Sequence, residues 1–125
     1  MLVIDDYADA ADLVCVVLGM LGYEARAAVT GRAALETSLE FTPNIVMLDI
    51  RLPDMTGYEI ARTLRERRDG SSVHLIALTG SARADDVVHA SEAGFDQYVL
   101  KPLDLAKITR LMTRAAAQAR SERVW

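Results

Sequence analysis

The run IVML at residues 45–48 decides the fold, because it is apolar without interruption and an aspartate follows it at once. It is too short for a helix and does not alternate with polar residues. Uninterrupted apolar runs of this length are typical of parallel strands that helices cover on both faces. Three comparable runs are LVI at 2–4, VHLIAL at 73–78 and YVL at 98–100. A weaker, more alternating segment, Tyr23 to Ala28, would suit an edge strand.

Stretches with helical spacing separate these strands, and we expect helices over about 9–21, 30–41, 57–68, 83–93 and 103–119. Gly22 and Gly94 stand where a helix C-terminal glycine is expected. One side of the first helix carries Leu13, Val17, Leu18 and Leu21. The last turn of the third carries Arg65, Arg67 and Arg68, where the helix dipole favours cations, and we expect a solvated helix end there.

Five alternations of strand and helix require parallel strands joined by right-handed helical crossovers. The predicted fold is therefore a doubly wound α/β fold of the flavodoxin-like type, with a five-stranded parallel sheet in the order 2-1-3-4-5 and five helices. In such folds ligands bind beyond the C-terminal ends of the strands. The 125 residues are close to the commonest size for one domain, so we expect a single domain over 1–125.

Composition excludes several classes of protein. Hydrophobic residues make up 51% and charged residues 26%, which is ordinary for a globular chain and unlike a disordered one. The formal charge of -4 has the wrong sign for a surface that grips nucleic acid. No apolar run is long enough to span a bilayer and no signal peptide is visible, so we expect a cytoplasmic protein. The single cysteine, Cys15, is expected to be a small helix residue without a redox or metal role.

The residues that carry chemistry all follow predicted strands. Asp5 and Asp6 come after the first strand, Asp49 ends the third, Thr79 ends the fourth and Lys101 follows the fifth. The strand order brings them to one edge of the sheet, where three carboxylates repel one another and call for a cation, protonation or both. Oxygen ligands without His or Cys favour a hard cation such as Mg²⁺.

Each of these residues also has an ordinary structural interpretation. The Asp5-Asp6 pair could cap the first helix, Asp49 could sit at a solvated strand end, and Lys101 could be a surface residue. Together they are harder to explain in that way. The Thr79-Gly80 pair adds a hydroxyl and a backbone N–H, which are suitable donors for a phosphoryl oxygen.

The motifs MLVIDD, IVMLDIRLPDMTGYE, LIALTG and AGFDQYVLKP resemble those of the response regulator receiver family, in order and over almost the whole chain. The segment LTGSARADD followed by AGFDQYVLKP is similar to receivers attached to hybrid histidine kinases. The resemblance implies a phosphoacceptor domain of a two-component phosphorelay, which takes a phosphoryl group from a histidine kinase or phosphotransfer protein. Such a domain catalyses only its own phosphorylation and dephosphorylation.

The resemblance also assigns roles to single residues. It makes Asp49 the phosphoacceptor. Asp6, Asp49 and the Arg51 carbonyl would bind Mg²⁺, for which Mn²⁺ can substitute, with Asp5 acting largely through water. The remaining assignments are phosphate contacts from Thr79, Gly80 and Lys101, a switch pair formed by Thr79 and Tyr98, and a cis peptide bond before Pro102. A partner protein or attached domain would read the signal through the fourth helix, fifth strand and fifth helix, without direct nucleic-acid contact or membrane insertion.

Three other functions compete with the receiver interpretation. A flavodoxin relative needs a phosphate-cradling loop after the first strand, where the two aspartates would repel anions. A phosphatase of the haloacid dehalogenase type has two aspartates separated by one residue, whereas Asp5 and Asp6 are adjacent. A binding module that keeps the fold but works without phosphorylation is the alternative left open.

Overall fold

Five parallel strands form one sheet in the order β2-β1-β3-β4-β5, as the sequence predicts. The strands are β1 (Leu2–Ile4), β2 (Arg26–Ala28), β3 (Ile45–Asp49), β4 (His74–Thr79) and β5 (Gln97–Leu100). They belong to a computed structural model that describes residues 1–40, 43–67, 73–80, 84–101 and 103–123, with the backbone alone at 84–85 and 115–123. The predicted doubly wound α/β fold is therefore confirmed.

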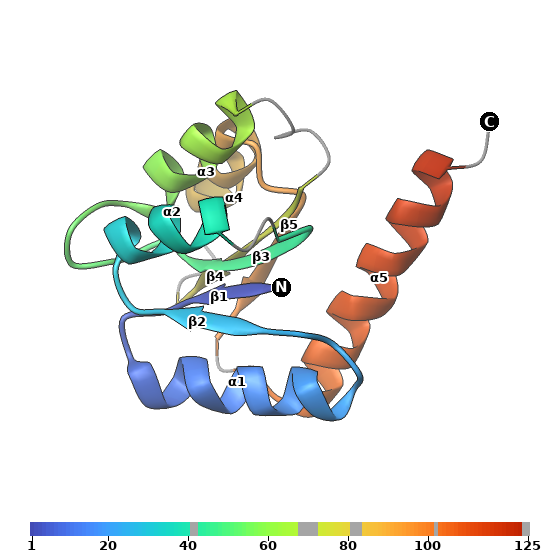
Figure 1. Cartoon of the computed structure of the whole chain (residues 1–125). Coiled ribbons are helices and arrows are strands. Elements are labelled where there is room, and N and C mark those ends of the chain that lie inside the picture. The colour runs from blue at the N-terminus through green and yellow to red at the C-terminus, as the bar shows by residue number, and fades with distance from the viewer. Residues whose placement is uncertain (41–42, 68–72, 81–83, 102, 124–125) are drawn as a thin grey trace.

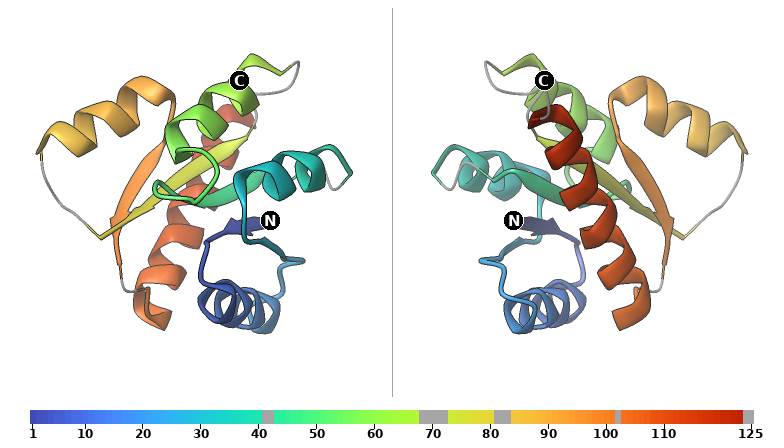
Figure 2. Two further views of the ribbon diagram at one scale, coloured as in Figure 1. Left: turned by 90° about the vertical axis from the view of Figure 1, so that its left-hand side faces the viewer. Right: turned by 90° about the vertical axis from the view of Figure 1, so that its right-hand side faces the viewer.

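Helices cover both faces of the sheet, with α1 (Ala8–Met20) and α5 (Leu105–Arg123) on one side. The other side carries α2 (Gly31–Glu40), α3 (Gly57–Glu66) and α4 (Ala84–Ala93). Figures 1 and 2 show this three-layer arrangement, with the C-terminal part of α5 running past the end of the sheet. Among the described residues, no helix combines the length and the apolar character that a bilayer span requires.

The two cores follow from the period-two geometry of the strands. In β4, Leu75 and Ala77 face α2, α3 and α4, whereas Ile76 and Leu78 face α1 and α5. Because successive side chains point to opposite faces, a strand covered on both sides must be apolar at every position. This requirement explains the uninterrupted apolar runs in the sequence.

The buried face of α1 differs from the predicted one. Ala11, Val14 and Leu18 are buried, whereas Leu13 is 64% exposed and Leu21 is 42% exposed. Successive helical residues turn by about 100°, so Leu13 lies nearly opposite Ala11. The prediction holds for Leu18 and for the partly buried Val17. It is wrong for Leu13 and Leu21 because it chose the face by the large side chains, whereas a small alanine faces the sheet. Gly22 and Gly94 do follow helices with positive φ, as expected.

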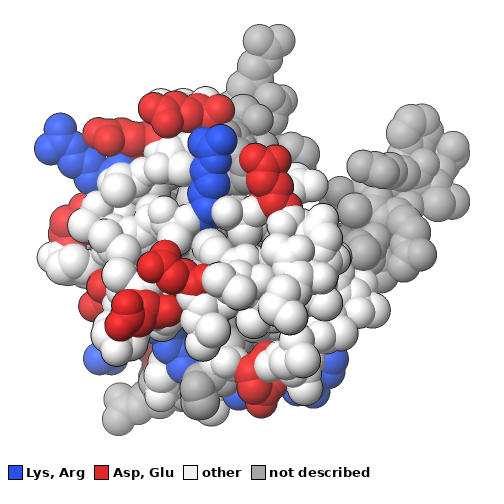
Figure 3. Space-filling view, turned by 60° about the horizontal axis from the view of Figure 1, so that its bottom comes forward, with Lys and Arg blue, Asp and Glu red and all other residues white. Residues whose placement is uncertain are grey.

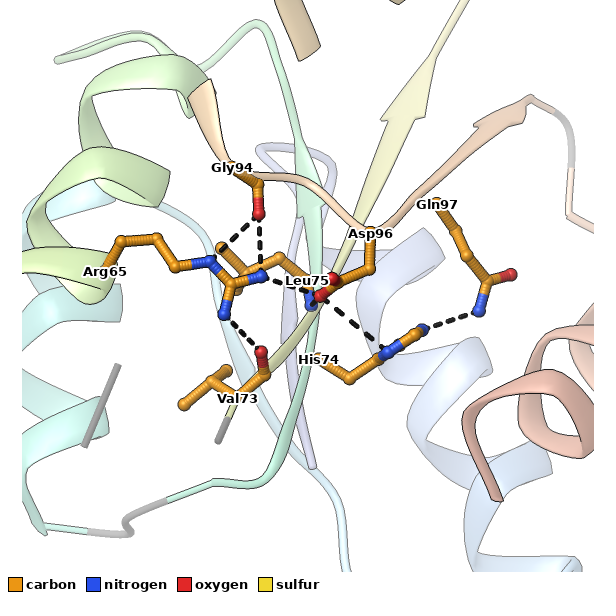
Figure 4. A network of polar contacts seen from close by, with 7 residues as sticks. All are labelled: Arg65, Val73, His74, Leu75, Gly94, Asp96 and Gln97. Atoms are coloured by element: carbon orange, nitrogen blue, oxygen red, sulfur yellow. Dashed lines mark hydrogen bonds and ion pairs between the residues drawn. The ribbon is translucent and has the colours of Figure 1, made fainter. Parts of the chain in front are cut away.

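The predicted solvated arginine end of α3 is wrong for Arg65. Its guanidinium donates to the Gly94 carbonyl from Nε (2.9 Å) and Nη2 (2.7 Å), and to the Val73 carbonyl from Nη1 (2.6 Å). It also forms an ion pair with Asp96 at 2.7 Å, and the same Asp96 oxygen accepts from the Leu75 N–H. Figure 4 shows this Arg65 network, which joins α3 to the starts of β4 and β5.

The other two arginines of the cluster have different outcomes. Arg67 donates to the Ser38 hydroxyl of α2, so it too makes a tertiary contact, and Arg68 lies outside the described residues. The dipole argument correctly favoured cations at this helix end. It could not anticipate that the end of α3 lies against backbone carbonyls, which need donors once they are shielded from water.

Replacing Arg65 by methionine should lower the free energy of unfolding by about 1–3 kcal/mol, because two carbonyls and Asp96 lose their donor while the aliphatic stem is kept. Arg32→Met is the control, since its ion pair with Glu36 is exposed and contributes at most about 0.5 kcal/mol. Urea unfolding would measure both variants. Equal losses would contradict the structural role assigned to Arg65.

Candidate functional site

The parallel strands bring the predicted site residues to one edge of the sheet. Asp5 follows β1, Asp49 ends β3, Thr79 ends β4 and Lys101 follows β5. One carboxylate oxygen each from Asp5, Asp6 and Asp49 lies within 4.8 Å of the others. Residues 96 positions apart in the chain are thus in direct contact, as the predicted strand order requires.

Lys101 bridges two of the three carboxylates. Its Nζ donates to Asp49 Oδ2 at 2.7 Å and to Asp5 Oδ2 at 3.0 Å. Both aspartates are buried, at 7% and 6% exposure. Partial burial of the Lys101 ammonium acts to lower its pKa, but the hydrogen bonds and charges of Asp49 and Asp5 outweigh burial and raise the pKa. The lysine therefore stays protonated at neutral pH and offsets part of the acidic charge.

Backbone donors orient the buried carboxylates. Asp5 Oδ1 accepts from the Tyr7 N–H at 3.0 Å, and Asp49 Oδ1 accepts from the Arg51 N–H at 3.0 Å. Asp6 is exposed, and its carboxylate reaches the group from the outer side. The three carboxylates and the single ammonium group together carry a net negative charge. The atoms of this group that could coordinate a metal ion are all carboxylate oxygens. This set fits a hard divalent cation such as Mg²⁺.

Two of the three carboxylates, Asp5 and Asp6, line a cavity of about 490 Å³ between α1 and the segment after β5, together with Lys101. Its lining includes Asp5, Asp6, Tyr7, Leu13, Lys101 and Leu103. Figure 3 brings the α1 side of the molecule forward and shows largely uncharged surface with separate acidic and basic side chains on it. The cavity therefore adjoins the site on the side of Asp5, Asp6 and Lys101.

Thr79 and Tyr98 lie on the other side of the sheet edge. In the parallel register Ala77 pairs with Tyr98 and Thr79 with Leu100, so Thr79 shares a face with Ala77 and Tyr98. Tyr98 is half-buried and packs on the core beneath α3 and α4. Beside this core the Tyr58 and His89 rings lie 5.4 Å apart, which connects α3 to α4. Thr79 and Tyr98 thus lie on the same face of the sheet, on the neighbouring strands β4 and β5.

The remaining predicted site features involve Pro102, Gly80 and Arg51. Pro102 lies outside the described residues, so the predicted cis peptide bond stays a prediction. Gly80 is exposed at the end of β4, beside Thr79. The side chain of Arg51 is also exposed, and its backbone donates to Asp49. The phosphate contacts of Thr79, Gly80 and Lys101 stay predictions.

Sequence reasoning missed the role of Gly57. A Cβ on this residue would lie 2.7 Å from Ile50 Cα and 2.8 Å from the Asp49 carbonyl oxygen, so no larger residue fits without displacing the strand end that carries Asp49. The Gly57 N–H also donates to the Ile50 carbonyl at 2.7 Å. The glycine in the motif LPDMTG was the available signal, but only the return of the chain onto Asp49 explains it.

An α/β fold with oriented carboxylates and a bridging lysine at the strand ends defines a class of signalling domain, and comparison with known proteins identifies it. The family model of the response regulator receiver domain matches residues 1–113. The chain belongs to this family, whose members are the receiver domains of two-component systems. The predicted family membership is therefore confirmed.

Individual relatives agree with the family. The DNA-binding response regulator MtrA of Mycolicibacterium paratuberculosis is 35% identical over 119 residues, which cover 95% of this chain and 50% of MtrA. The chain spans about half the length of the first curated relatives it matches.

Two solved structures have closely similar folds. A CheY-like receiver domain protein from Methanospirillum hungatei is 28% identical, with a TM-score of 0.87, and the match covers 97% of this chain and 95% of the other. The signal receiver domain of a signal transduction histidine kinase from Syntrophus aciditrophicus is 26% identical, with a TM-score of 0.83, and the match covers 94% and 89%. This chain is therefore similar both to a CheY-like receiver and to the receiver domain of a histidine kinase.

Adding Mg²⁺ should stabilise the protein, because a cation held by the three carboxylates binds the folded state and not the unfolded chain. At a concentration ten times the Kd, the gain is about 1.4 kcal/mol. Thermal or urea unfolding with and without Mg²⁺, at constant ionic strength, would measure it. Asp49→Asn should lose most of the gain, and an undiminished gain in this variant would place the cation elsewhere.

Proposed function

We propose that residues 1–125 form a single receiver domain in which Asp49 accepts a phosphoryl group from a phosphohistidine of a histidine kinase or phosphotransfer protein. The contact of Lys101 Nζ with both Asp49 and Asp5 carries this proposal. A lysine held 2.7 Å from the acceptor carboxylate is placed to pair with the charge of a group transferred to that carboxylate.

The proposed reaction is a direct phosphoryl transfer. A carboxylate oxygen of Asp49 attacks phosphorus, a new oxygen–phosphorus bond forms and the nitrogen–phosphorus bond of the donor breaks. The departing imidazole keeps the bonding electron pair and takes up a proton. Backbone donation from Arg51 to Asp49 Oδ1 keeps the carboxylate oriented for attack.

In this proposal Mg²⁺ is held by Asp6, Asp49 and the Arg51 carbonyl, with Asp5 acting largely through water, and Mn²⁺ can replace it. When bound, the cation supplies charge neutralisation between the acceptor and the transferring phosphoryl group. The three neighbouring carboxylate oxygens support this assignment. Lys101 contributes a second positive charge from the strand-five side.

The signal would pass from Thr79 to Tyr98. Phosphorylation shifts an equilibrium only if it stabilises one state more than another. A Thr79 hydroxyl drawn toward the phosphoryl oxygens, with Gly80 N–H as a further donor, leaves room behind it for Tyr98 to turn inward. That change reshapes the surface of α4, β5 and α5, where a partner protein or attached domain would bind. The shared sheet face of Thr79 and Tyr98 supports this route.

The predicted absence of direct nucleic-acid contact stays a prediction. Relatives such as MtrA are named DNA-binding response regulators, but this chain spans only about half their length. Its formal charge of -4 favours a protein partner over a nucleic acid for the receiver itself. A cytoplasmic location without membrane insertion, and catalysis limited to the domain's own phosphorylation and dephosphorylation, are parts of the same proposal.

Acetyl phosphate or beryllofluoride should modify the protein at Asp49 only with Mg²⁺ or Mn²⁺ present, because the acidic site repels anions until a cation neutralises it. Mass spectrometry of the intact protein and its peptides would locate the label for acetyl phosphate. Asp49→Asn is the control. Equal labelling of this variant, or labelling that survives a chelator, would favour the alternative of a binding module that works without phosphorylation.

Lys101→Ala should keep the fold but uncouple phosphorylation from partner binding, because the lysine connects the phosphoryl group to the end of β5. Labelling at Asp49 and partner affinity would be measured on the same samples. Arg32→Ala is a suitable control, since the Arg32 side chain is exposed on α2, outside the proposed partner surface, and pairs with Glu36. Wild-type phosphorylation-dependent binding in Lys101→Ala would contradict the coupling.

A further inference from the structure

The loop between β3 and α3, residues 50–56, is mostly exposed. It follows Asp49 directly and carries the Arg51 carbonyl. Its two ends are joined to each other, because Arg51 forms an isolated bridge with Thr56 and the Gly57 N–H donates to the Ile50 carbonyl. Its tip, Asp54 and Met55, lies between the bridged residues Arg51 and Thr56, and an anchor outside the loop is needed to fix the loop relative to the rest of the fold.

That anchor is the start of α2. Asp54 Oδ1 accepts from the Gly31 N–H at 2.8 Å, and Asp54 Oδ2 accepts from the Arg32 N–H at 2.9 Å. The first N–H groups of a helix have no partner within the helix, so this carboxylate satisfies two of them from a distant loop. Figure 1 shows the loop between β3 and α3 beside α2.

A second contact holds the same loop to the same helix. A Cβ on Gly31 would lie 2.2 Å from Met55 Cγ and 2.5 Å from Met55 Sδ, so the Met55 side chain fills the space that a larger residue at 31 would occupy. Gly31 is buried, although the helix exposes its neighbour Arg32. Adjacent loop residues thus make a polar contact and an apolar contact with one helix end.

We propose that Asp54 is a positioning residue for the cation site: by tying the tip of the 50–56 loop to α2, it holds the Arg51 carbonyl in place to bind Mg²⁺. The inference rests on the proposed function, since it needs the cation at Asp49. Groups that orient metal ligands strongly influence affinity even without touching the ion. Donation from the Arg32 and Gly31 N–H groups also lowers the pKa of Asp54, so the tie persists throughout the neutral range.

A purely structural role for Asp54 makes a different prediction. If Asp54 served only as a helix cap, its loss would lower stability and leave the cation affinity of the folded protein unchanged. The chain offers a matched control for this case. Thr30 caps the same helix by accepting from the Ala33 N–H at 3.1 Å, and it makes this contact without the loop.

Calorimetric titration with MgCl₂ would separate the two roles, at a temperature where circular dichroism finds every variant folded. Asp54→Ala should raise the Kd for Mg²⁺ by about 10-fold, in the range typical for groups that orient ligands. Asp54→Asn should raise it less, because it keeps one acceptor oxygen. Thr30→Ala should lose stability to a similar extent with its Kd unchanged.

Wild-type affinity in Asp54→Ala or in Asp54→Asn would overturn the inference, as would an equal loss of affinity in Thr30→Ala. Asp49→Asn distinguishes these results from failure of the proposed function. If the wild type does not bind Mg²⁺, or if Asp49→Asn binds it equally well, the cation site itself is wrong and the role of Asp54 falls with it. Should Asp54→Ala fail to fold, the comparison of Asp54→Asn with Thr30→Ala decides.

Discussion

The contact between the Lys101 ammonium and the buried carboxylates of Asp5 and Asp49 is the constraint on which the site depends. Carboxylates placed this close together and shielded from water repel one another strongly, and one lysine offsets only part of that charge. The fold therefore maintains a negative, oxygen-lined site whose remaining charge favours a cation. This excess of negative charge also makes the site suitable for phosphoryl chemistry, because it is neutralised only when a cation binds.

Backbone contacts hold the buried carboxylates of the site in place despite their mutual repulsion. Each buried carboxylate has an oxygen held by an N–H two residues further along the chain, from Tyr7 or Arg51. Behind Asp49, Gly57 allows the start of α3 to press against the end of β3. The capping sequence Thr56 to Glu59 begins α3 at this point, with the Thr56 hydroxyl accepting from the Glu59 N–H. The aspartate is thus fixed by a turn and a helix start together.

The opposite end of the sheet is stabilised separately from the site. There Arg65 joins α3 to the starts of β4 and β5, while His74 lies between Asp96 and the Gln97 amide. The opposite ends of β4 and β5 carry Thr79 and Lys101, for which the proposed function predicts a response to phosphorylation. Tyr98 lies between the two regions on the face covered by α3 and α4. The contacts of Arg65 and His74 thus lie at the end of the sheet opposite the carboxylates.

The sequence alone determined the fold class and the strand order, and it placed the candidate site residues at the ends of strands, because uninterrupted apolar runs, helical spacing and polar residues directly after strands are visible without the structure. The roles of the site residues stay predictions. The tertiary structure decided which faces are buried and which distant groups meet. It placed Ala11 instead of Leu13 against the sheet, turned the expected solvated Arg65 into a tertiary contact, and brought Asp54 to the start of α2. No periodicity encodes such contacts, because they depend on the close approach of elements that only the packed chain brings together.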